Sequence, residues 1–222
     1  MSADPSELPI DEAVRAVRAS SRRRQILIAA AKVMQSKGFH QMSMQALADE
    51  ANVSVGLLYK YFGNKEEILL ATITAILDAF RDQLEPAMAA AGPDPVERLA
   101  AGIRRFVEIV DENLDAVALT YRESRTLDPA GREKLKRLEI TTSAPLRAVL
   151  TEGIDAGIMN PVDVDLMVFD LVLLAHGWAL KHWHFGRLYS LDDYIRLQTR
   201  FVLNTVLPQT HRTHYRHLLE QP

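Results

Sequence analysis

Apolar residues recur every three or four positions along most of this chain, which is the spacing of one face of an α-helix. The first such series contains Ile26, Ala30 and Val33, in a helix predicted from about Ser20 to Lys37. No stretch alternates apolar and polar residues as a half-buried strand does. The pattern therefore predicts an all-α protein of about nine helices with no sheet.

Two short helices with a tight turn between them are predicted next. The first runs from about Met44 to Ala51, and the second ends at about Phe62. Ser43 and Ser54 each precede one of them, and a serine hydroxyl caps a helix by accepting a backbone N–H from its first turn. Asn52-Val53 makes the turn. This arrangement predicts a helix-turn-helix unit.

The second short helix has one apolar face and one face open to a partner. Leu58 and Phe62 are four residues apart on the same face and should pack inward. The outer face then carries Val55, Gly56, Tyr59 and Lys60. Small residues at a helix start allow close approach to base edges, and tyrosine and lysine reach phosphates. This helix therefore suits a DNA major groove.

A family resemblance is carried by three pieces of this region. They are KGF at 37–39, Ser43, and the run ALADEANVSVGLLYKYFGNKEEIL from Ala46 to Leu69. Residues 21–73 as a whole resemble the DNA-binding domain of the tetracycline-repressor (TetR) family of bacterial transcription regulators. The alternative is an amphipathic helix pair of an ordinary helical protein, but such a pair does not need two caps and an aromatic-rich helix end at this spacing.

The resemblance implies which residues of this chain meet DNA. Lys60 and Lys65 would contact phosphates, and Tyr59 and Tyr61 would position the recognition helix. Bases would be read from the start of that helix, where the side chains offer mainly van der Waals contacts. The complete predicted DNA-binding set is Ser43, Ser54, Val55, Gly56, Leu57, Tyr59, Lys60, Tyr61 and Lys65.

The distribution of charge agrees with DNA binding by one end of the chain. Residues 20–65 carry seven Lys or Arg residues and two acidic ones, a local net charge of +5. Because the whole chain has a formal net charge of −3, the remainder carries −8. Arg22, Arg23 and Arg24 oppose the dipole of the first helix unless a phosphate offsets them. A solvated helix start is the alternative.

The sequence divides into an N-terminal arm (residues 1–19, predicted to be flexible or to continue the first helix), a helix-turn-helix domain (20–66) and a helical effector-binding and dimerisation domain (67–222). Within the last domain, Pro86 is expected to end one helix and Asp94-Pro95 to begin the next. A long helix from Pro129 to about Ala156 should bend at Pro145. A loop is expected at 185–189.

An unusual stretch, HGWALKHWHF at 176–185, ends a strongly apolar helix. Trp178 and His182 share one face, with Lys181 on its flank. Together with cationic and aromatic residues of an earlier helix, they suit an acyl chain with an anionic head. The stretch is similar to a helix of TetR-family regulators that sense acyl-CoA thioesters. The predicted ligand-binding set is Phe106, Tyr121, Arg122, Arg125, Trp178, Lys181 and His182.

Other interpretations of this stretch remain open. His176, His182 and His184 do not have the spacing of metal ligands on one helix face, so no metal is predicted. Trp178 and Trp183 are equally compatible with a subunit interface or a core position. Glu123 or Asp170 would then be the internal partner of the cations.

Composition excludes several classes of function. The chain has no cysteine, which removes disulfides, thiol catalysis and thiolate metal sites. No GxSxG or Gly-rich phosphate loop occurs, so we expect no enzyme activity and no cofactor. The acidic net charge argues against a DNA-packaging protein. No apolar run reaches about 18 residues, and the start of the chain lacks a signal-peptide core, so a cytoplasmic protein without membrane contact is expected.

The resemblance to the TetR family implies the mode of action. We expect a homodimer that binds a palindromic double-stranded DNA operator, paired through its last two long helices. A small-molecule effector, in this interpretation an acyl-CoA or similar amphipathic anion, would release a repressor from DNA. An aromatic or other hydrophobic effector and an activator role remain alternatives, and a helical enzyme is a distant one.

Overall fold

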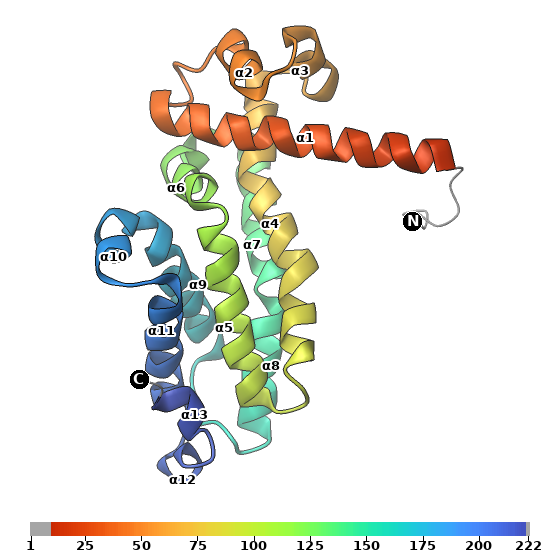
Figure 1. Cartoon of the computed structure of the whole chain (residues 1–222). Helices are drawn as coiled ribbons and strands as arrows, with labels where there is room; N and C mark the ends of the chain where they lie inside the picture. Colours follow the sequence, from red (N-terminus) through yellow and green to blue (C-terminus); the bar gives the residue numbers. More distant parts are fainter. Residues whose placement is uncertain (1–9, 221–222) are drawn as a thin grey trace. The chain divides into compact units, whose positions relative to one another are not determined.

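A computed structural model describes residues 10–220 of the chain and is helical throughout (Figure 1). It forms two compact units that divide between Thr72 and Ile73. The first unit holds α1 (Ile10–Lys37), α2 (Met44–Ala51), α3 (Val55–Tyr61) and the start of α4 (Lys65–Ala90). The second holds the rest of α4, α5 (Pro95–Asp111), α6 (Leu114–Glu123), the 3-10 helix η2 (Ser124–Thr126), α7 (Pro129–Thr142), α8 (Ala144–Asp155), α9 (Val164–Leu180), α10 (His182–Leu188), α11 (Leu191–Val206), α12 (Gln209–Arg212) and α13 (Arg216–Leu219).

The all-α class is confirmed, but the described residues contain more helices than the nine expected. The long helix predicted from Pro129 is two helices, because Ser143 ends α7 and begins α8. Pro145 lies in the first turn of α8, where N–H groups have no hydrogen-bond partner within the helix, so its missing N–H costs no helix hydrogen bond. The prediction of a single bent helix was therefore wrong.

The prediction of a loop at 185–189 was also wrong, because α10 covers most of these residues. The backbone leaves the α conformation at Lys181, whose carbonyl then accepts N–H groups from His184 at 2.8 Å and Phe185 at 2.9 Å. Phe185 packs its ring on Tyr194, with centroids 5.3 Å apart. This contact between α10 and α11 holds a helical turn where the sequence suggested a loop.

Pro86 lies inside α4 and does not end it. Leu84 and Met88, on either side of the proline, are both buried in the core of the second unit. Pro86 has no N–H to donate to the carbonyl of Asp82, four positions earlier. Both residues are exposed, so this carbonyl can bind water instead. Packing of the two flanking side chains thus offsets the lost hydrogen bond, and the helix continues to Ala90.

The N-terminal helix is longer than its apolar pattern. α1 begins at Ile10, so the part of the predicted flexible arm from Ile10 to Ala19 is helical, and the remainder lies outside the described residues. Among the side chains of α1 that the structure describes, the buried positions begin at Ile26. The core of this unit forms where they meet buried residues of the short helices: Ile26, Ala30, Met34, Leu47, Leu58 and Phe62.

The second unit is built around α5, which packs against α8, α9 and α11 (Figure 1). Its buried stripe recurs at helical spacing: Leu99, Ile103, Phe106, Val107 and Val110. Asp94 caps α5 by accepting the N–H groups of Val96 at 2.8 Å and Glu97 at 3.2 Å. Asp128, Asp163 and Ser190 cap α7, α9 and α11 in the same way.

The C-terminal segment is tied back to the start of α5. Tyr215 is buried, and its hydroxyl donates a hydrogen bond to the Asp94 carboxylate at 2.8 Å. His217 lies 2.8 Å from Glu97. Between Ile10 and Glu220, no helix combines the length and apolar character needed to cross a membrane.

Candidate DNA-binding surface and effector site

The α2–α3 pair has the geometry that its sequence predicted. Ser43 accepts the N–H of Ala46 at 3.1 Å, and Ser54 accepts that of Leu57 at 3.2 Å. Between the helices, Asn52 adopts the left-handed conformation with φ of 51°, which asparagine tolerates better than most residues. Both helix starts are therefore fixed by local hydrogen bonds.

The faces of α3 separate as expected. Leu58 and Phe62 are buried, whereas Gly56, Tyr59 and Lys60 are exposed, with Tyr59 at 54% of its full accessible area. The other predicted DNA contacts on this helix, Val55, Leu57 and Tyr61, are half-buried. A β-carbon added at Gly56 would meet no atom within 4 Å. This outer face is thus shaped by small side chains at its start and by Tyr59 and Lys60 beyond.

Lys65, the last predicted phosphate contact, also has a role inside the unit. Its ammonium donates to the carbonyl oxygen of His40 at 3.0 Å and lies 4.7 Å from the centre of the Phe39 ring. An ammonium group has three donors, so a phosphate can still be bound. Lys65 therefore ties the start of α4 to the loop after α1, and phosphate contact stays a prediction.

Replacing Lys65 by alanine should consequently change two measurable quantities. Loss of the bond to His40 should lower the free energy of unfolding by about 1 kcal/mol. Loss of a phosphate contact should lower the slope of log K against log salt by about one per subunit, equally for all DNA sequences. Urea unfolding and DNA titrations over a salt series measure the two effects. An unchanged salt slope would remove Lys65 from the DNA surface.

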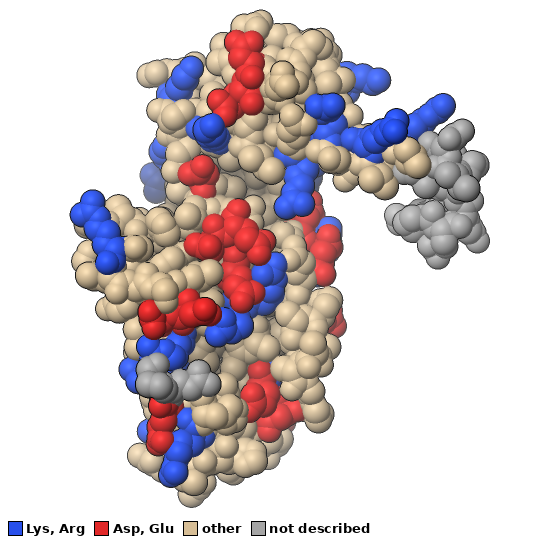
Figure 2. All heavy atoms as spheres, viewed as in Figure 1, with Lys and Arg blue, Asp and Glu red and all other residues tan. Residues whose placement is uncertain are grey.

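Basic side chains follow α1 in the first unit (Figure 2). Arg23 lies over the Phe62 ring, with its guanidinium carbon 5.4 Å from the ring centre. Lys32 pairs with Glu50 at 2.6 Å, so one of the acids of α2 is neutralised within the unit. The local excess of positive charge seen in the sequence is therefore carried on the surface.

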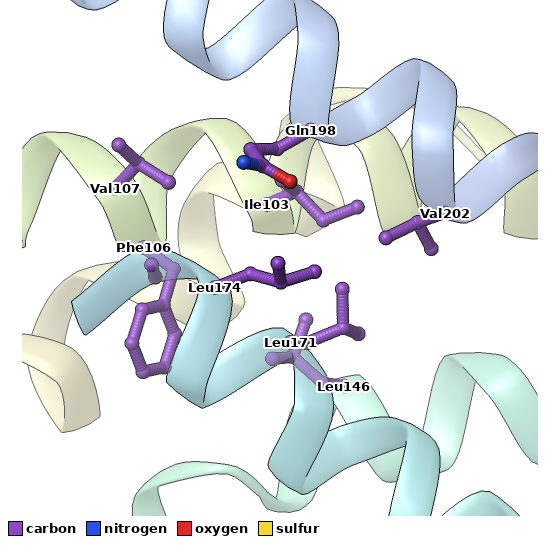
Figure 3. Close-up of a pocket in the computed structure, with 9 residues that line it drawn as sticks. Ile103, Phe106, Val107, Leu146, Leu171, Leu174, Gln198 and Val202 are labelled. Carbon is purple, nitrogen blue, oxygen red and sulfur yellow. The ribbon is translucent and has the colours of Figure 1, made fainter. Parts of the chain in front are cut away.

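In the second unit, helices α5, α8, α9 and α11 enclose a small apolar cavity of about 10 Å³ (Figure 3). Its lining comprises Ile103, Phe106, Val107, Leu146, Leu171, Leu174, Ala175, Gln198 and Val202. Gln198 from α11 brings an amide to an otherwise apolar wall. The space is about that of one water molecule. A larger ligand therefore requires these helices to move apart.

Of the seven residues predicted to bind the effector, Phe106 lines this cavity and the other six do not. Trp178 is 3% exposed, and its indole N–H donates to Asp111 at 2.7 Å. Its ring contacts those of His182 and Tyr194, with centroids 5.0 and 4.9 Å away. Trp178 and His182 are thus brought together, in an aromatic cluster of α9, α10 and α11.

The predicted cations Arg122, Arg125 and Lys181 lie at exposed positions of this unit. Arg122 pairs with the nearly buried carboxylate of Glu123 at 3.0 Å, one of the internal anions considered from the sequence. Across residues 10–220, no three metal-ligating side chains lie together. The ligand roles of these residues stay predictions.

A polar contact that the sequence did not indicate joins α6 to α9. The Tyr121 hydroxyl lies 2.9 Å from Nδ1 of His176, and the His176 ring is 5.9 Å from the Phe106 ring, which lines the cavity. Burial lowers the pKa of His176 to about 4, so the imidazole is neutral. Burial raises the pKa of Tyr121, with a contribution from Glu139. The two partners are 55 positions apart, so no local pattern could reveal them.

The burial of His176 predicts a pH dependence of stability. Since the pKa of His176 is lowered from 6.5 to about 4, the unfolded chain takes up a proton that the folded chain does not. The free energy of unfolding should fall as pH decreases from 6.5 to about 4, by up to about 1.4 kcal/mol per pH unit. Burial raises the pKa of Glu139, and this group acts in the opposite direction.

Comparing urea unfolding of the wild type with that of His176→Gln therefore isolates the histidine. The difference in free energy between the two proteins should change steadily from pH 6.5 downward. A constant difference across that range would show that His176 protonates equally in both states.

Comparisons with known proteins match both units. Residues 26–72 match the family model of bacterial regulatory proteins, tetR family, and residues 92–184 match the tetracyclin repressor-like, C-terminal domain. The HTH-type transcriptional regulator HbdR of Aromatoleum sp. (strain CIB) is 35% identical over 174 residues, which span 78% of this chain and 76% of that protein.

Solved structures share the fold. The TetR family regulator PfmR from Thermus thermophilus has a TM-score of 0.70 and 26% identity, covering 82% of this chain and 96% of that one. The regulator FadR from Bacillus subtilis, in complex with stearoyl-CoA, has a TM-score of 0.66 and 26% identity, covering 82% and 95%. All three are transcriptional regulators, which is the class of protein that the sequence predicted. With a helix-turn-helix unit, a helical second unit and a close relative that spans both, this chain belongs to the TetR family of transcriptional regulators.

Proposed function

We propose that this regulator is a homodimer that binds a palindromic DNA operator through α3 and represses transcription. An amphipathic anion, such as an acyl-CoA, would bind the second unit and release the protein from DNA. The outer face of α3 supports the DNA-binding part, because Gly56, Tyr59 and Lys60 are exposed beside buried Leu58. A regulator of chromosomal genes would act in the cytoplasm.

Exposed apolar side chains support the dimer. On α9, Leu166, Phe169 and Leu173 are three or four positions apart and exposed, although the opposite face of the same helix is buried in the core. Phe201 on α11 is also exposed. Large exposed apolar patches mark interaction sites. A helix that is apolar on both faces is explained if its second face pairs with another copy.

Glutamate at Leu173 or Phe201 should therefore separate the subunits and abolish tight operator binding, because a charge would be buried in the pair. Ile140→Glu is the matched control, since Ile140 is an exposed apolar residue on α7. Sedimentation velocity measures the oligomeric state. Dimers that persist in both α9 and α11 variants would contradict this arrangement.

The apolar cavity supports an effector with a hydrocarbon part. Its walls contain only one polar side chain, Gln198, and exposed Arg122, Arg125 and Lys181 offer charge for an anionic part on the same unit. The related FadR structure contains stearoyl-CoA. A ligand larger than the present cavity must prefer a conformation in which the lining helices are farther apart. That preference is the source of the free energy that would change operator affinity.

A ligand series tests this part of the proposal. The probes are CoA, acyl-CoAs of increasing chain length, free fatty acids and aromatic acids. At a hundredfold excess over its Kd, an effector should stabilise the protein by about 2.7 kcal/mol and raise Tm by roughly 5–10 °C. The same compound should release a labelled operator duplex. A response to aromatic acids alone would contradict the acyl-CoA assignment.

A reporter gene placed behind the operator decides between repression and activation. Deleting the regulator should raise expression, and adding the effector should have the same effect without the deletion. Lower expression after the deletion would overturn the repressor assignment.

A further inference from the structure

The first half of α1 is helical but has no buried side chain among those described. Residues 14, 15 and 17–25 are all exposed, and burial begins at Ile26. In this unit, α1 runs past α3, with its N-terminal part projecting beyond the α2–α3 pair (Figure 1). Residues 14–25 span roughly 18 Å at the rise of an α-helix. Tertiary packing stabilises most helices. In this stretch the contacts to other helices lie at its C-terminal end, where Arg23 stacks on Phe62 and Gln25 donates to the carbonyl oxygen of Ala51 at 2.8 Å.

The charge of this exposed stretch has one sign. Arg15, Arg18 and Arg22 are three and four positions apart and share one helix face, and Arg23 and Arg24 follow. From residue 13 to residue 48 the chain contains no Asp or Glu. Like charges at this spacing repel each other and destabilise an isolated helix. The composition therefore favours a polyanionic partner over bare solvent.

We propose that the Arg15–Arg18–Arg22 face is a second DNA contact, which binds phosphates of the duplex flanking the operator. This inference rests on the proposed docking of α3 in the major groove. Because α1 projects beyond α3, its arginines reach backbone that the recognition helix does not cover. Contacts of this kind carry no sequence information. They add affinity and salt dependence and fix the protein on the duplex.

The test uses the full-length protein and a duplex recovered from a random-sequence pool by repeated selection. One form of this duplex keeps long flanks. The other is shorter at each end by about five base pairs, which is the length covered by roughly 18 Å of helix. Wild type and the Arg15→Gln/Arg18→Gln double variant are titrated with both forms over a salt series. Glutamine has nearly the helix propensity of arginine, and circular dichroism checks the helix content.

On the long duplex, the double variant should raise Kd at least about tenfold and lower the salt slope by about two per subunit. On the short duplex, it should bind like the wild type. The matched control is Lys134→Gln/Lys136→Gln, which removes the same charge from exposed positions of α7. That control should leave the salt slope on both duplexes unchanged.

Each other outcome has a defined meaning. If the double variant equals the wild type on the long duplex, or loses the same affinity on both duplexes, the flanking contact is overturned while the docking of α3 stands. If the α7 control loses as much affinity as the double variant, the loss comes from the lower net charge of the protein and not from a local contact, and the inference is also overturned. Failure of the wild type to select any duplex would overturn the proposed function and this inference with it.

Discussion

Replacing Gly56 by aspartate should abolish operator binding while leaving the protein folded. Gly56 lies in the first turn of α3, on the exposed face, and an added β-carbon meets no protein atom within 4 Å. The substitution therefore has room in the free protein. Against DNA it would place bulk and a carboxylate where the helix approaches base edges and phosphates. The loss should be about a hundredfold or more in Kd, measured by anisotropy with a labelled duplex.

Gly56→Ala separates the contributions of size and charge. Alanine adds one methyl group in the same open space and favours the helix by about 1 kcal/mol over glycine. Its Tm should be equal to or above that of the wild type, and any loss of affinity then reports contact with DNA. An aspartate variant with wild-type affinity would show that α3 does not dock as proposed.

Of the substitutions proposed here, Trp178→Ala should lower the free energy of unfolding most, by about 3–5 kcal/mol. The indole is 3% exposed, packs on His182 and Tyr194, and donates its N–H to Asp111 at 2.7 Å. Removing it leaves a cavity and an acceptor without its donor. Urea unfolding measures the change. Trp178→Phe keeps an aromatic ring but loses the N–H, so its loss should be smaller.

The chain contains a matched control for this substitution. Its other tryptophan, Trp183, is 67% exposed on α10, and Trp183→Ala should change the free energy of unfolding by less than about 0.5 kcal/mol. Equal losses at the two positions would contradict the burial described above. A destabilised Trp178 variant that still responds normally to effector would remove Trp178 from the predicted ligand site.

Local sequence patterns were sufficient for the helical class and for most helix starts. Ser43, Ser54, Asp94 and Asp128 bind N–H groups two or three residues ahead, so their effect is contained in the neighbouring sequence. The division of α3 into buried and exposed faces follows from helical periodicity in the same way. The resemblance to the TetR family rested on this local region, where caps, turn and apolar face occur at fixed spacing.

The arrangement of the second unit was decided by side-chain contacts between helices, which the pattern within one helix does not contain. Leu84 and Met88 continue α4 through Pro86, and the contact of Phe185 with Tyr194 holds α10 where a loop was expected. The sequence left open whether Trp178 is buried, because its hydrogen-bond partner Asp111 is 67 positions away, and its role as a ligand contact stays a prediction. Side-chain periodicity shows that a helix face is apolar, and only the tertiary structure shows whether core, cavity or solvent lies against it.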